Sequence, residues 1–477
     1  MGKKSIIKQK PIMMFFDRKA ELNFLESRYE SKQPELLVFW GRRRIGKTFL
    51  LREFCKRKNG LFFLATTSNS KNNLAEFSKQ LAEYYDDERL KLSPLQNWDD
   101  FFLYINEKAT RRTVFVIDEY SYLVLSETSI SSVFQKYWDL YLSQNANILF
   151  IICGSAISMM EKETLDYRAP LYGRRTGQWF LEPFDVLASN EFFRYKKLVH
   201  LIEAFCITGG TPFYNQLLCQ YKNIFSAIED KILNKGQVLY QEVDFLLRQE
   251  FASPKSYFPI LKAMSLGSRK FGEISSKTGI DKSNLVKYLS TLEKLRLVRR
   301  ETPVTESRPE KSRKGLYFIN DNFINFWFTF VFPNLSFLES YETERVMDES
   351  VRPHFNYYVS RIVEPVIIKL LKIDYFQTGL SFAKIGRYWD AHIELDFLGE
   401  TDNNRTVIGE IKWTDSPCST SVYNHLIRKL PKIKNPIYVI VSKSGFDKGL
   451  QKLNDENLKL IDLAKLTINN SSQTDNT

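Results

Sequence analysis

The chain has 477 residues, too many for a single hydrophobic core, so about three domains of the usual size of about 100–200 residues are expected. Hydrophobic residues make up 43% of it, with 37 Phe and 24 Tyr, which favours large packed cores over disorder. The net charge of +12 favours an acidic partner such as nucleic acid, although an ordinary lysine-rich surface is the alternative.

The cysteines and the hydropathy exclude further classes. The five cysteines form no C-x-x-C pair, which argues against a zinc site or disulfide framework and for reduced thiols. The lysine-rich N-terminus lacks the apolar run of a signal peptide, and no stretch approaches the ~20 apolar residues of a membrane span. We therefore expect a soluble cytoplasmic protein with no membrane partner and a frayed polar tail at residues 469–477.

Residues 36–54 carry the strongest motif. An apolar strand pattern leads into G-x-x-x-x-G-K-[ST] without a mismatch, and a helical pattern follows. This context is typical of a phosphate-binding loop, whose backbone N–H groups wrap a phosphate at a helix start, and it disfavours a simple glycine turn with a surface lysine. The lysine would reach the β- and γ-phosphates, and the threonine would hold Mg²⁺. The predicted nucleotide-binding residues are Gly41, Arg42, Arg43, Arg44, Ile45, Gly46, Lys47 and Thr48.

A second strand, within residues 113–119, ends in two acids. Ligands of open α/β sheets bind beyond the carboxyl ends of strands, so Asp118 would lie near the metal ion. Glu119 could orient or deprotonate the attacking water. The alternative is a strand that acids merely cap.

Two later segments offer further candidates for the nucleotide site. The apolar strand at residues 148–153 is followed by Gly154 and Ser155, where the serine either senses the γ-phosphate or lies in a turn. Arg174 and Arg175 follow, and an arginine near a γ-phosphate stabilises charge in the transition state. A solvated pair, or contact with a partner's acid, is the alternative for these arginines.

In the order of these motifs the chain resembles the archaeal and bacterial AAA-type ATPases of the STAND class that end in a DUF234-type domain. The resemblance covers roughly residues 10–465 and implies an ATPase core with a helical lid. Residues 16–22 resemble the box that packs near the adenine, with Asp17 in place of the usual glycine and Arg18 matching. Residues 210–212 resemble the Gly-x-Pro element of the lid, which would place Pro212 against the nucleotide.

A change of pattern after residue 250 predicts a winged helix. Helices are expected at residues 257–266 and 271–278, the second closed by Gly279, and Asp281 would cap a third helix that runs to residue 295. Strands at residues 297–304 and 316–320 would form the wing. The third helix of such a fold enters the major groove of DNA. The predicted base contacts are Lys282, Ser283, Asn284 and Lys287.

The wing itself has mixed charge. Six basic residues could meet phosphates, namely Arg299, Arg300, Arg308, Lys311, Arg313 and Lys314. Glu301, Glu306 and Glu310 lie among them, which weakens a simple basic patch. A winged helix that only packs against protein is therefore the alternative to DNA binding.

Residues 386–413 predict two paired strands with a metal-binding pattern. Asp396 lies on the first strand, and strand alternation places Glu410 and Lys412 on one face of the second. Two carboxylates can hold Mg²⁺ or Mn²⁺, the metal activates water, and Lys412 can orient the nucleophile. The pattern resembles the PD-(D/E)XK nuclease superfamily, in which Glu364 would match an additional helix-borne acid.

Three points qualify this site. Because Pro365 follows Glu364, we expect Glu364 at a helix start rather than inside a helix. Glu394 shares a face with Asp396 and is the alternative ligand. A Glu410–Lys412 salt bridge on an exposed strand is the alternative to a site.

Residues 437–442 are expected to form the next core strand.

The predicted fold class is multidomain α/β. Residues 10–250 would form a P-loop NTPase core with a helical lid, residues 251–335 a winged helix-turn-helix, and residues 336–468 a restriction-endonuclease-like domain. The predicted function is an ATP-hydrolysing switch that binds DNA and couples nucleotide state to metal-dependent phosphodiester cleavage. The alternatives are an ATP-gated DNA-binding regulator with an inert nuclease-like domain, and a hub in which nucleotide state controls homo-oligomerisation.

Overall fold

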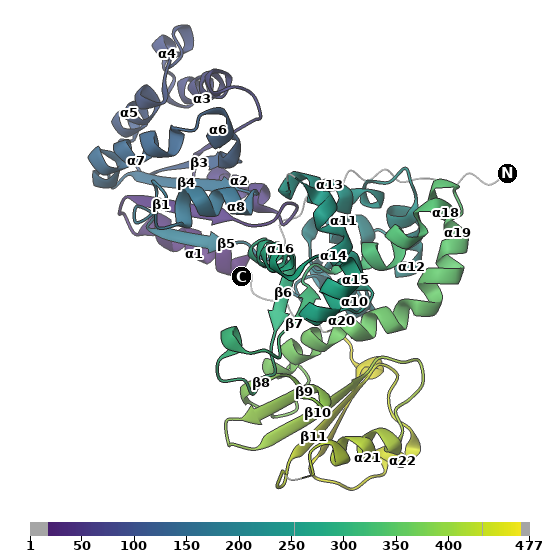
Figure 1. Ribbon diagram of the computed structural model, residues 1–477. Helices are drawn as coiled ribbons and strands as arrows, with labels where there is room; N and C mark the ends of the chain where they lie inside the picture. The colour runs from purple at the N-terminus through teal and green to yellow at the C-terminus, as the bar shows by residue number, and fades with distance from the viewer. Residues whose placement is uncertain (1–17, 252, 432, 469–477) are drawn as a thin grey trace, which may run out of the picture. The chain divides into compact units, whose positions relative to one another are not determined.

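The computed structural model describes residues 18–251, 253–431 and 433–468 (Figure 1). The chain divides into two compact units, Met1–Pro183 and Phe184–Thr477. Residues 184–250, which the sequence joins to the ATPase core as a lid, cluster with the second unit. In the described part of the chain, no helix combines the length and apolar character that crossing a bilayer requires.

The first unit is built on one parallel sheet with the order β2-β3-β4-β1-β5. The three middle strands are buried along their whole length, as expected for a parallel sheet that is covered on both faces. Strand β4 lies between the strand that leads into the phosphate loop and the strand that ends in two acids. The five strands are β1 Glu35–Trp40, β2 Leu61–Leu64, β3 Thr113–Asp118, β4 Ile148–Gly154 and β5 Gly177–Phe180.

Helices cover this sheet. Helix α2 packs Leu50, Leu51 and Phe54 against Val114, Val116 and the inner face of β4, which forms one core of the unit. Helices α3 and α5 add aromatic packing, in which Phe63 of β2 stacks on Phe77. The helices are α1 Lys19–Glu30, α2 Lys47–Arg57, α3 Ser70–Tyr85, α4 Glu88–Leu92, α5 Trp98–Lys108, α6 Tyr120–Ser126, α7 Ile130–Leu140 and α8 Ile157–Met160.

The second unit begins with helices and continues into the winged helix. Asp281 caps the third helix of the predicted motif by accepting a hydrogen bond from the Asn284 N–H at 3.0 Å. Gly279 closes the preceding helix with φ of 69°, as expected for a left-handed helix end. The elements are α9 Asn190–Phe193, α10 Leu198–Thr208, α11 Pro212–Leu218, α12 Ile224–Ala227, α13 Glu242–Glu250, α14 Phe258–Ser265, α15 Phe271–Thr278, α16 Lys282–Lys294, β6 Val298–Glu301 and β7 Leu316–Ile319.

The prediction that Glu364 lies at a helix start is wrong. Helix α20, Arg352–Lys372, continues through Pro365, which lies inside it. An internal proline removes a helical hydrogen bond and costs about 3 kcal/mol. The helix compensates by burying Val363, Val366 and Ile367. It is preceded by α17 Asn322–Phe326, α18 Leu335–Glu339 and α19 Thr343–Val346.

The C-terminal sheet has the order β12-β11-β10-β9-β8. Strands β8, β9 and β10 are antiparallel, and β11 and β12 continue the sheet in parallel from β10. Helix α20 packs against β8, β9 and β10, while α21 packs against β10 and β11. The elements are β8 Phe382–Trp389, β9 Glu394–Thr401, β10 Thr406–Lys412, α21 Thr420–Lys429, β11 Ile437–Ser442, α22 Lys448–Gln451 and β12 Leu458–Asp462.

The architecture expected from the sequence is confirmed: a multidomain α/β protein with a parallel-sheet unit that carries the phosphate loop, a helix-turn-helix region and a separate C-terminal sheet domain. Several predicted elements match the observed bounds, among them the helix at residues 271–278 and the strand at residues 437–442. The finer domain boundaries stay predictions.

Candidate nucleotide site, DNA interface and acidic cluster

The phosphate loop joins β1 to α2 through a backbone that few residue types can adopt. Gly41, Arg44 and Gly46 have φ of 155°, 68° and 89°, all in the positive region that favours glycine. A Cβ on Gly41 would lie 2.6 Å from the Leu181 carbonyl oxygen, so this position also needs glycine for space. The loop is thereby shaped to turn its amides toward a ligand at the start of α2.

Lys47 occupies the centre of this loop. Its side chain is buried, and Nζ donates hydrogen bonds to the carbonyls of Gly41 and Arg42, both at 2.8 Å. Burial lowers the pKa of Lys47, whereas the nearby Cys153, Glu119 and Asp118 act to raise it. Thr48, the next residue, is exposed.

Arg18 lies beside the loop and fastens its backbone. Its Nη2 donates to the Ile45 carbonyl at 2.9 Å, and its Nη1 donates to the Glu182 carbonyl and to Glu21 Oε1, each at 2.9 Å. Its observed role is therefore to anchor the loop, and an adenine contact stays a prediction. Asp17 lies outside the described residues. Arg43 Nη2 donates to Tyr122 Oη at 3.1 Å.

The two acids at the end of β3 are held differently. Asp118 is fully buried; its Oδ1 accepts from the Glu119 N–H at 3.0 Å, while its Oδ2 has no hydrogen-bond partner within the described chain. Glu119 has φ of 53° at the start of α6. Ser155 Oγ donates to Glu119 Oε2 at 2.8 Å, which positions this carboxylate.

The residues at this site fit a nucleotide-bound Mg²⁺ ion. Magnesium prefers oxygen ligands, few of them from protein. The buried Asp118 oxygen without a partner and the exposed Thr48 hydroxyl supply the two expected donors.

The remaining nucleotide candidates have other partners. Arg174 forms an ion pair with Asp139 at 2.9 Å, and Arg175 Nη1 donates to the Thr164 carbonyl at 2.7 Å. Pro212 is the first residue of α11, after Gly210, where a Cβ would lie 1.9 Å from the Phe184 carbonyl oxygen. Roles for these residues in sensing or binding nucleotide stay predictions.

The start of α16 is an exposed polar surface. Lys282, Ser283, Asn284 and Lys287 are all exposed, as a DNA interface requires. However, Asp281 accepts hydrogen bonds from Ser283 Oγ and Asn284 Nδ2, both at 2.6 Å. The two lysines are therefore the better candidates for contact with nucleic acid.

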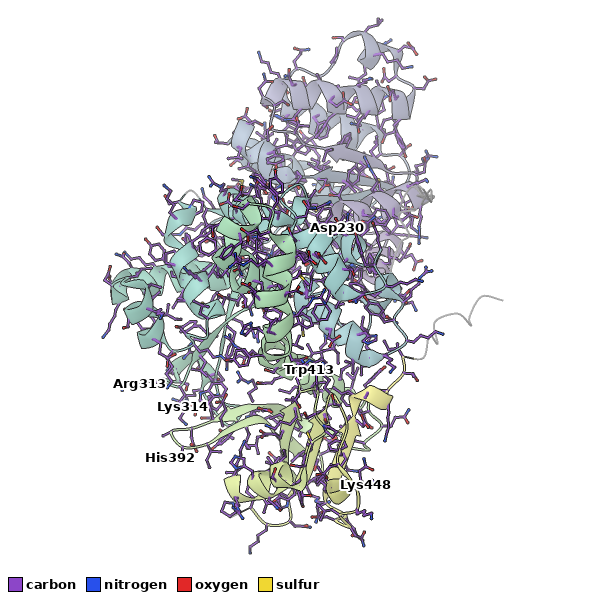
Figure 2. All side chains as sticks on the ribbon, turned by 90° about the vertical axis from the view of Figure 1, so that its right-hand side faces the viewer. Asp230, Arg313, Lys314, His392, Trp413 and Lys448 are labelled. Atoms are coloured by element: carbon purple, nitrogen blue, oxygen red, sulfur yellow. The ribbon has the colours of Figure 1, made fainter. Side chains whose placement is uncertain are left out.

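On the wing, Arg299 is paired with Glu301 at 2.6 Å and Lys314 with Glu306 at 2.8 Å. Arg313 and Lys314 lie on the exposed loop between β6 and β7 (Figure 2). The two glutamates thus neutralise part of the positive charge of the wing, as their positions in the sequence indicate.

The predicted catalytic residues of the C-terminal sheet do come together. Asp396 Oδ2 accepts a hydrogen bond from the Ile411 N–H at 2.6 Å, so it lies beside the strand that carries Glu410 and Lys412. Lys412 Nζ lies 2.6 Å from Glu410 Oε1. Lys429 of α21, which sequence reasoning missed, lies 2.8 Å from Glu410 Oε2. Glu410 is buried, so this pair is not on an exposed strand.

Glu364 joins the same region through an arginine. Arg387, a second residue that sequence reasoning left without a role, is ion-paired with Glu364 at 2.5 Å and with Glu394 at 3.1 Å. Burial, reinforced by Glu364 and Glu410, raises the pKa of Asp396 to about 7. Burial acts to raise the pKa of Glu410 as well, but Lys412 and Lys429 hold it below its ordinary value.

Glu364, Asp396 and Glu410, together called the acidic cluster below, do not fit a metal ion as they are arranged. Both oxygens of Glu410 face lysines, and Glu364 is engaged by Arg387. Within the part of the chain that the structure describes, no three His, Cys, Asp or Glu side chains are grouped to hold a metal. A metal site at Glu364, Asp396 and Glu410 stays a prediction from the sequence.

Comparison with known families matches three segments of the chain. Residues 15–214 match a family described as an ATPase domain predominantly from Archaea. Residues 327–424 match DUF234, archaeal and bacterial proteins of unknown function, and residues 259–300 match the arsR family of bacterial regulatory proteins.

Two individual proteins are similar over much of the chain. An uncharacterised protein of Methanocaldococcus jannaschii is 33% identical over 425 residues, covering 87% of this chain and 92% of that protein. The Walker-type ATPase of Pyrococcus abyssi superposes with a TM-score of 0.50 at 20% identity, covering 66% of this chain and 96% of that one.

The raised pKa of Asp396 predicts a pH-dependent effect of Asp396→Asn on stability. Between the ordinary aspartate pKa and about 7, Asp396 keeps a proton in the folded protein that it has lost in the unfolded chain, so the contribution of Asp396 to stability falls as the pH rises through this range. Asparagine cannot ionise. The thermal unfolding midpoint of the variant, relative to wild type, should therefore be higher at pH 8 than at pH 5. The exposed Asp402 of the same hairpin, changed to Asn, should show no such difference.

If Asp396→Asn shifted the midpoint equally at both pH values, Asp396 would titrate as an ordinary aspartate.

Proposed function

The chain belongs to the family of ATPases that join an ATPase domain of the archaeal type to a C-terminal DUF234 domain, and on that premise we propose that it is an ATP-hydrolysing switch that binds DNA. The observation that carries the proposal is that the phosphate loop holds a buried Lys47 while Asp118, whose charge reaches Lys47, has a buried oxygen with no hydrogen-bond partner among the described residues. Such a pair is poised to meet a phosphate and its cation.

The protein's own groups account for the nucleotide step. Lys47 exchanges its bonds to the Gly41 and Arg42 carbonyls for phosphate oxygens, and the loop amides bind the same phosphates. Thr48 and Asp118 would hold Mg²⁺, which supplies charge neutralisation when it is bound. Glu119 orients the attacking water, and Ser155 fixes the position of that carboxylate.

The DNA step rests on the winged helix. Lys282 and Lys287 are exposed on the first turns of α16, and residues 259–300 match a family of bacterial regulators. In a winged helix this surface enters the major groove. The net charge of +12 adds an attraction to DNA that salt weakens. ATP and ADP are expected to give different DNA affinities, which makes the protein a switch.

Two substitutions test the nucleotide step. Lys47→Ala should abolish ATP binding and hydrolysis, because the loop then loses its only buried cation among the described residues. Glu119→Gln should keep ATP binding but lower kcat by roughly 10²-fold or more, the usual effect of losing a general base. Binding is measured by calorimetry and hydrolysis by phosphate release.

Lys56→Ala, on an exposed position of the same helix, is the matched control and should behave as wild type. Full hydrolysis by the Lys47→Ala protein would remove the basis of the proposal.

DNA binding is tested with Lys282→Ala combined with Lys287→Ala. The slope of log affinity against log salt should fall by about 0.9 for every phosphate that a lysine no longer neutralises, so the double variant should show a decrease of up to about 1.8. The measurement is fluorescence anisotropy of duplex DNA at several salt concentrations, with ATP or with ADP.

Lys294→Ala, exposed at the other end of α16, should leave DNA binding unchanged. In the Lys47→Ala protein, DNA affinity should no longer depend on ATP. An unchanged salt slope in the double variant would mean that α16 does not bind DNA.

For the C-terminal sheet domain we propose binding without cleavage, the alternative left open by the sequence. The support is the acidic cluster, in which Lys412, Lys429 and Arg387 engage the acids that a metal would need. Supercoiled plasmid incubated with Mg²⁺ or Mn²⁺, with and without ATP, should therefore stay intact. Metal-dependent nicking that is absent from Glu410→Ala would instead establish the cleavage predicted from the sequence.

A further inference from the structure

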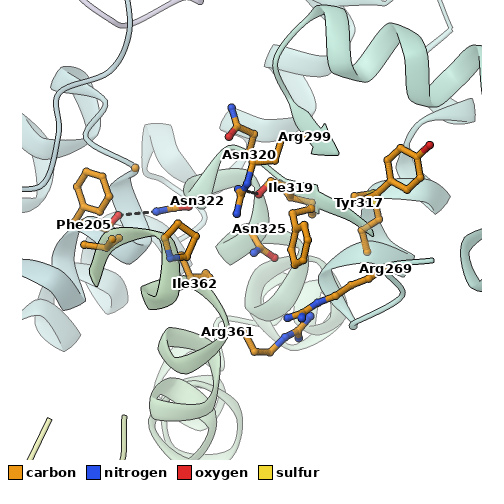
Figure 3. A pocket seen from close by; sticks show the side chains of 15 residues that line it. Phe205, Arg269, Arg299, Tyr317, Ile319, Asn320, Asn322, Asn325, Arg361 and Ile362 are labelled. Carbon is orange, nitrogen blue, oxygen red and sulfur yellow. Dashed lines mark hydrogen bonds between the residues drawn. The ribbon is translucent and has the colours of Figure 1, made fainter. Parts of the chain in front are cut away.

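A cavity of about 150 Å³ lies within the second unit, where three parts of the fold meet (Figure 3). Phe205 and Asn325 line it from α10 and from the end of α17, and Arg269 and Phe318 line it from the winged helix. Arg361 lines it from α20. On the same volume scale a single water molecule needs about 10–15 Å³, so a cavity of this size has room for a small organic molecule.

The unusual feature of the cavity is a pair of arginines without an acid. Figure 3 shows the guanidinium groups of Arg269 and Arg361 close to one another. Neither forms an ion pair within the described residues. Among the described residues, the Arg361 guanidinium donates one hydrogen bond, to the Ser265 carbonyl at 3.0 Å. Burial lowers the pKa of Arg269, and the charges of Arg387 and Arg361 lower it further.

The nearby acids are already engaged. Glu364 and Glu394, whose charges reach Arg269, are ion-paired with Arg387 at 2.5 and 3.1 Å. Arg299, the third arginine of the lining, is paired with Glu301 at 2.6 Å. Two half-buried like charges that lack a counter-ion repel one another. An anion between them would remove that repulsion and would accept charge-assisted hydrogen bonds from both groups.

The rest of the lining shows what else the ligand carries. The Asn325 side-chain amide lines the cavity and has no hydrogen-bond partner among the described residues. Phe205, Met264, Ile362 and Pro365 form an apolar wall. An inorganic anion alone would leave this wall in contact with water, whereas an organic body attached to the anion would cover it.

We propose that this cavity binds a small organic phosphate of the size of a nucleoside monophosphate, with the phosphate held by Arg269 and Arg361. Asn325 hydrogen-bonds the ligand, and the apolar wall covers its organic part. The site is separate from the phosphate loop and does not depend on the proposed ATPase activity. Because Arg269 belongs to the winged helix and Arg361 to α20, the ligand ties the two together and, on the basis of the DNA binding proposed above, acts as an effector of that binding.

The test uses the full chain carrying Lys47→Ala, so that the phosphate loop does not respond. Inorganic phosphate and AMP should raise its thermal unfolding midpoint, AMP more strongly, while adenosine should have no effect. Binding of AMP is then measured by calorimetry. Adding Arg269→Gln or Arg361→Gln should weaken AMP binding roughly tenfold or more, as expected when a charge-assisted hydrogen bond is removed. Arg345→Gln, exposed and paired on α19, is the control and should bind AMP normally.

The ligand-free protein gives an independent readout. Because the two guanidinium groups repel, Arg269→Gln without ligand should unfold at the same temperature as the parent or at a higher one. If Arg269 were purely structural, the ligand-free Arg269→Gln variant would unfold at a lower temperature than the parent. That result, together with a parent protein that does not respond to phosphate or AMP, would overturn the proposal. Loss of duplex DNA binding in both variants, with no binding of AMP by the parent, would also overturn it and would assign the arginines to the DNA backbone.

Discussion

The nucleotide-binding unit depends on keeping one buried lysine charged. Removing an ammonium group from water is costly unless acceptors and negative charges surround it. The carbonyls of Gly41 and Arg42 and the charges of Asp118 and Glu119 meet this requirement for Lys47. The carbonyls can reach the lysine because the loop backbone passes through the left-handed region. The acids lie close because only β4 separates the strand that ends in them, β3, from the strand that leads into the loop, β1. The Asp118 oxygen that has no partner in the described chain is what this arrangement leaves for a ligand.

The second unit must also compensate its buried charges, and its acidic cluster and its cavity do so differently. In the acidic cluster two of the acids are ion-paired, Glu410 with two lysines and Glu364 with Arg387, whereas Asp396 forms no ion pair within the described residues and accepts a hydrogen bond from the Ile411 N–H. Removing either partner would leave a buried charge uncompensated, which is strongly destabilising. In the cavity, by contrast, Arg269 and Arg361 form no ion pair with a described carboxylate, although nearby Arg387 is ion-paired with Glu301, Glu364 and Glu394. The difference separates a self-contained ion-pair network from a site that needs an external anion.

Much of this architecture could be predicted from one sequence because local patterns encode it. The phosphate loop follows from its residue spacing, the strands from apolar runs, and the start of α16 from a cap at Asp281. The pairings that define the sites could not be predicted in this way. Lys429 reaches Glu410 from a helix beyond the strand pair, and Ser155 reaches Glu119 from another strand, so only tertiary structure brings them together. The local rule that a proline begins or ends a helix fails at Pro365 for a related reason, because burial of the flanking Val363, Val366 and Ile367 outweighs the missing hydrogen bond.

Helix α20 connects the two charge systems of the second unit. Arg361 and Glu364 are three residues apart and therefore neighbours on one face of the helix, the first lining the cavity and the second held by Arg387 in the acidic cluster. Pro365 lies at the same turn and lines the cavity, and it removes the amide that the Arg361 carbonyl would otherwise meet. This turn therefore lacks one hydrogen bond of the helical ladder. A ligand bound between Arg361 and Arg269 would contact the same helical turn that presents Glu364 to Arg387, which gives the cavity a direct structural connection to the acidic cluster.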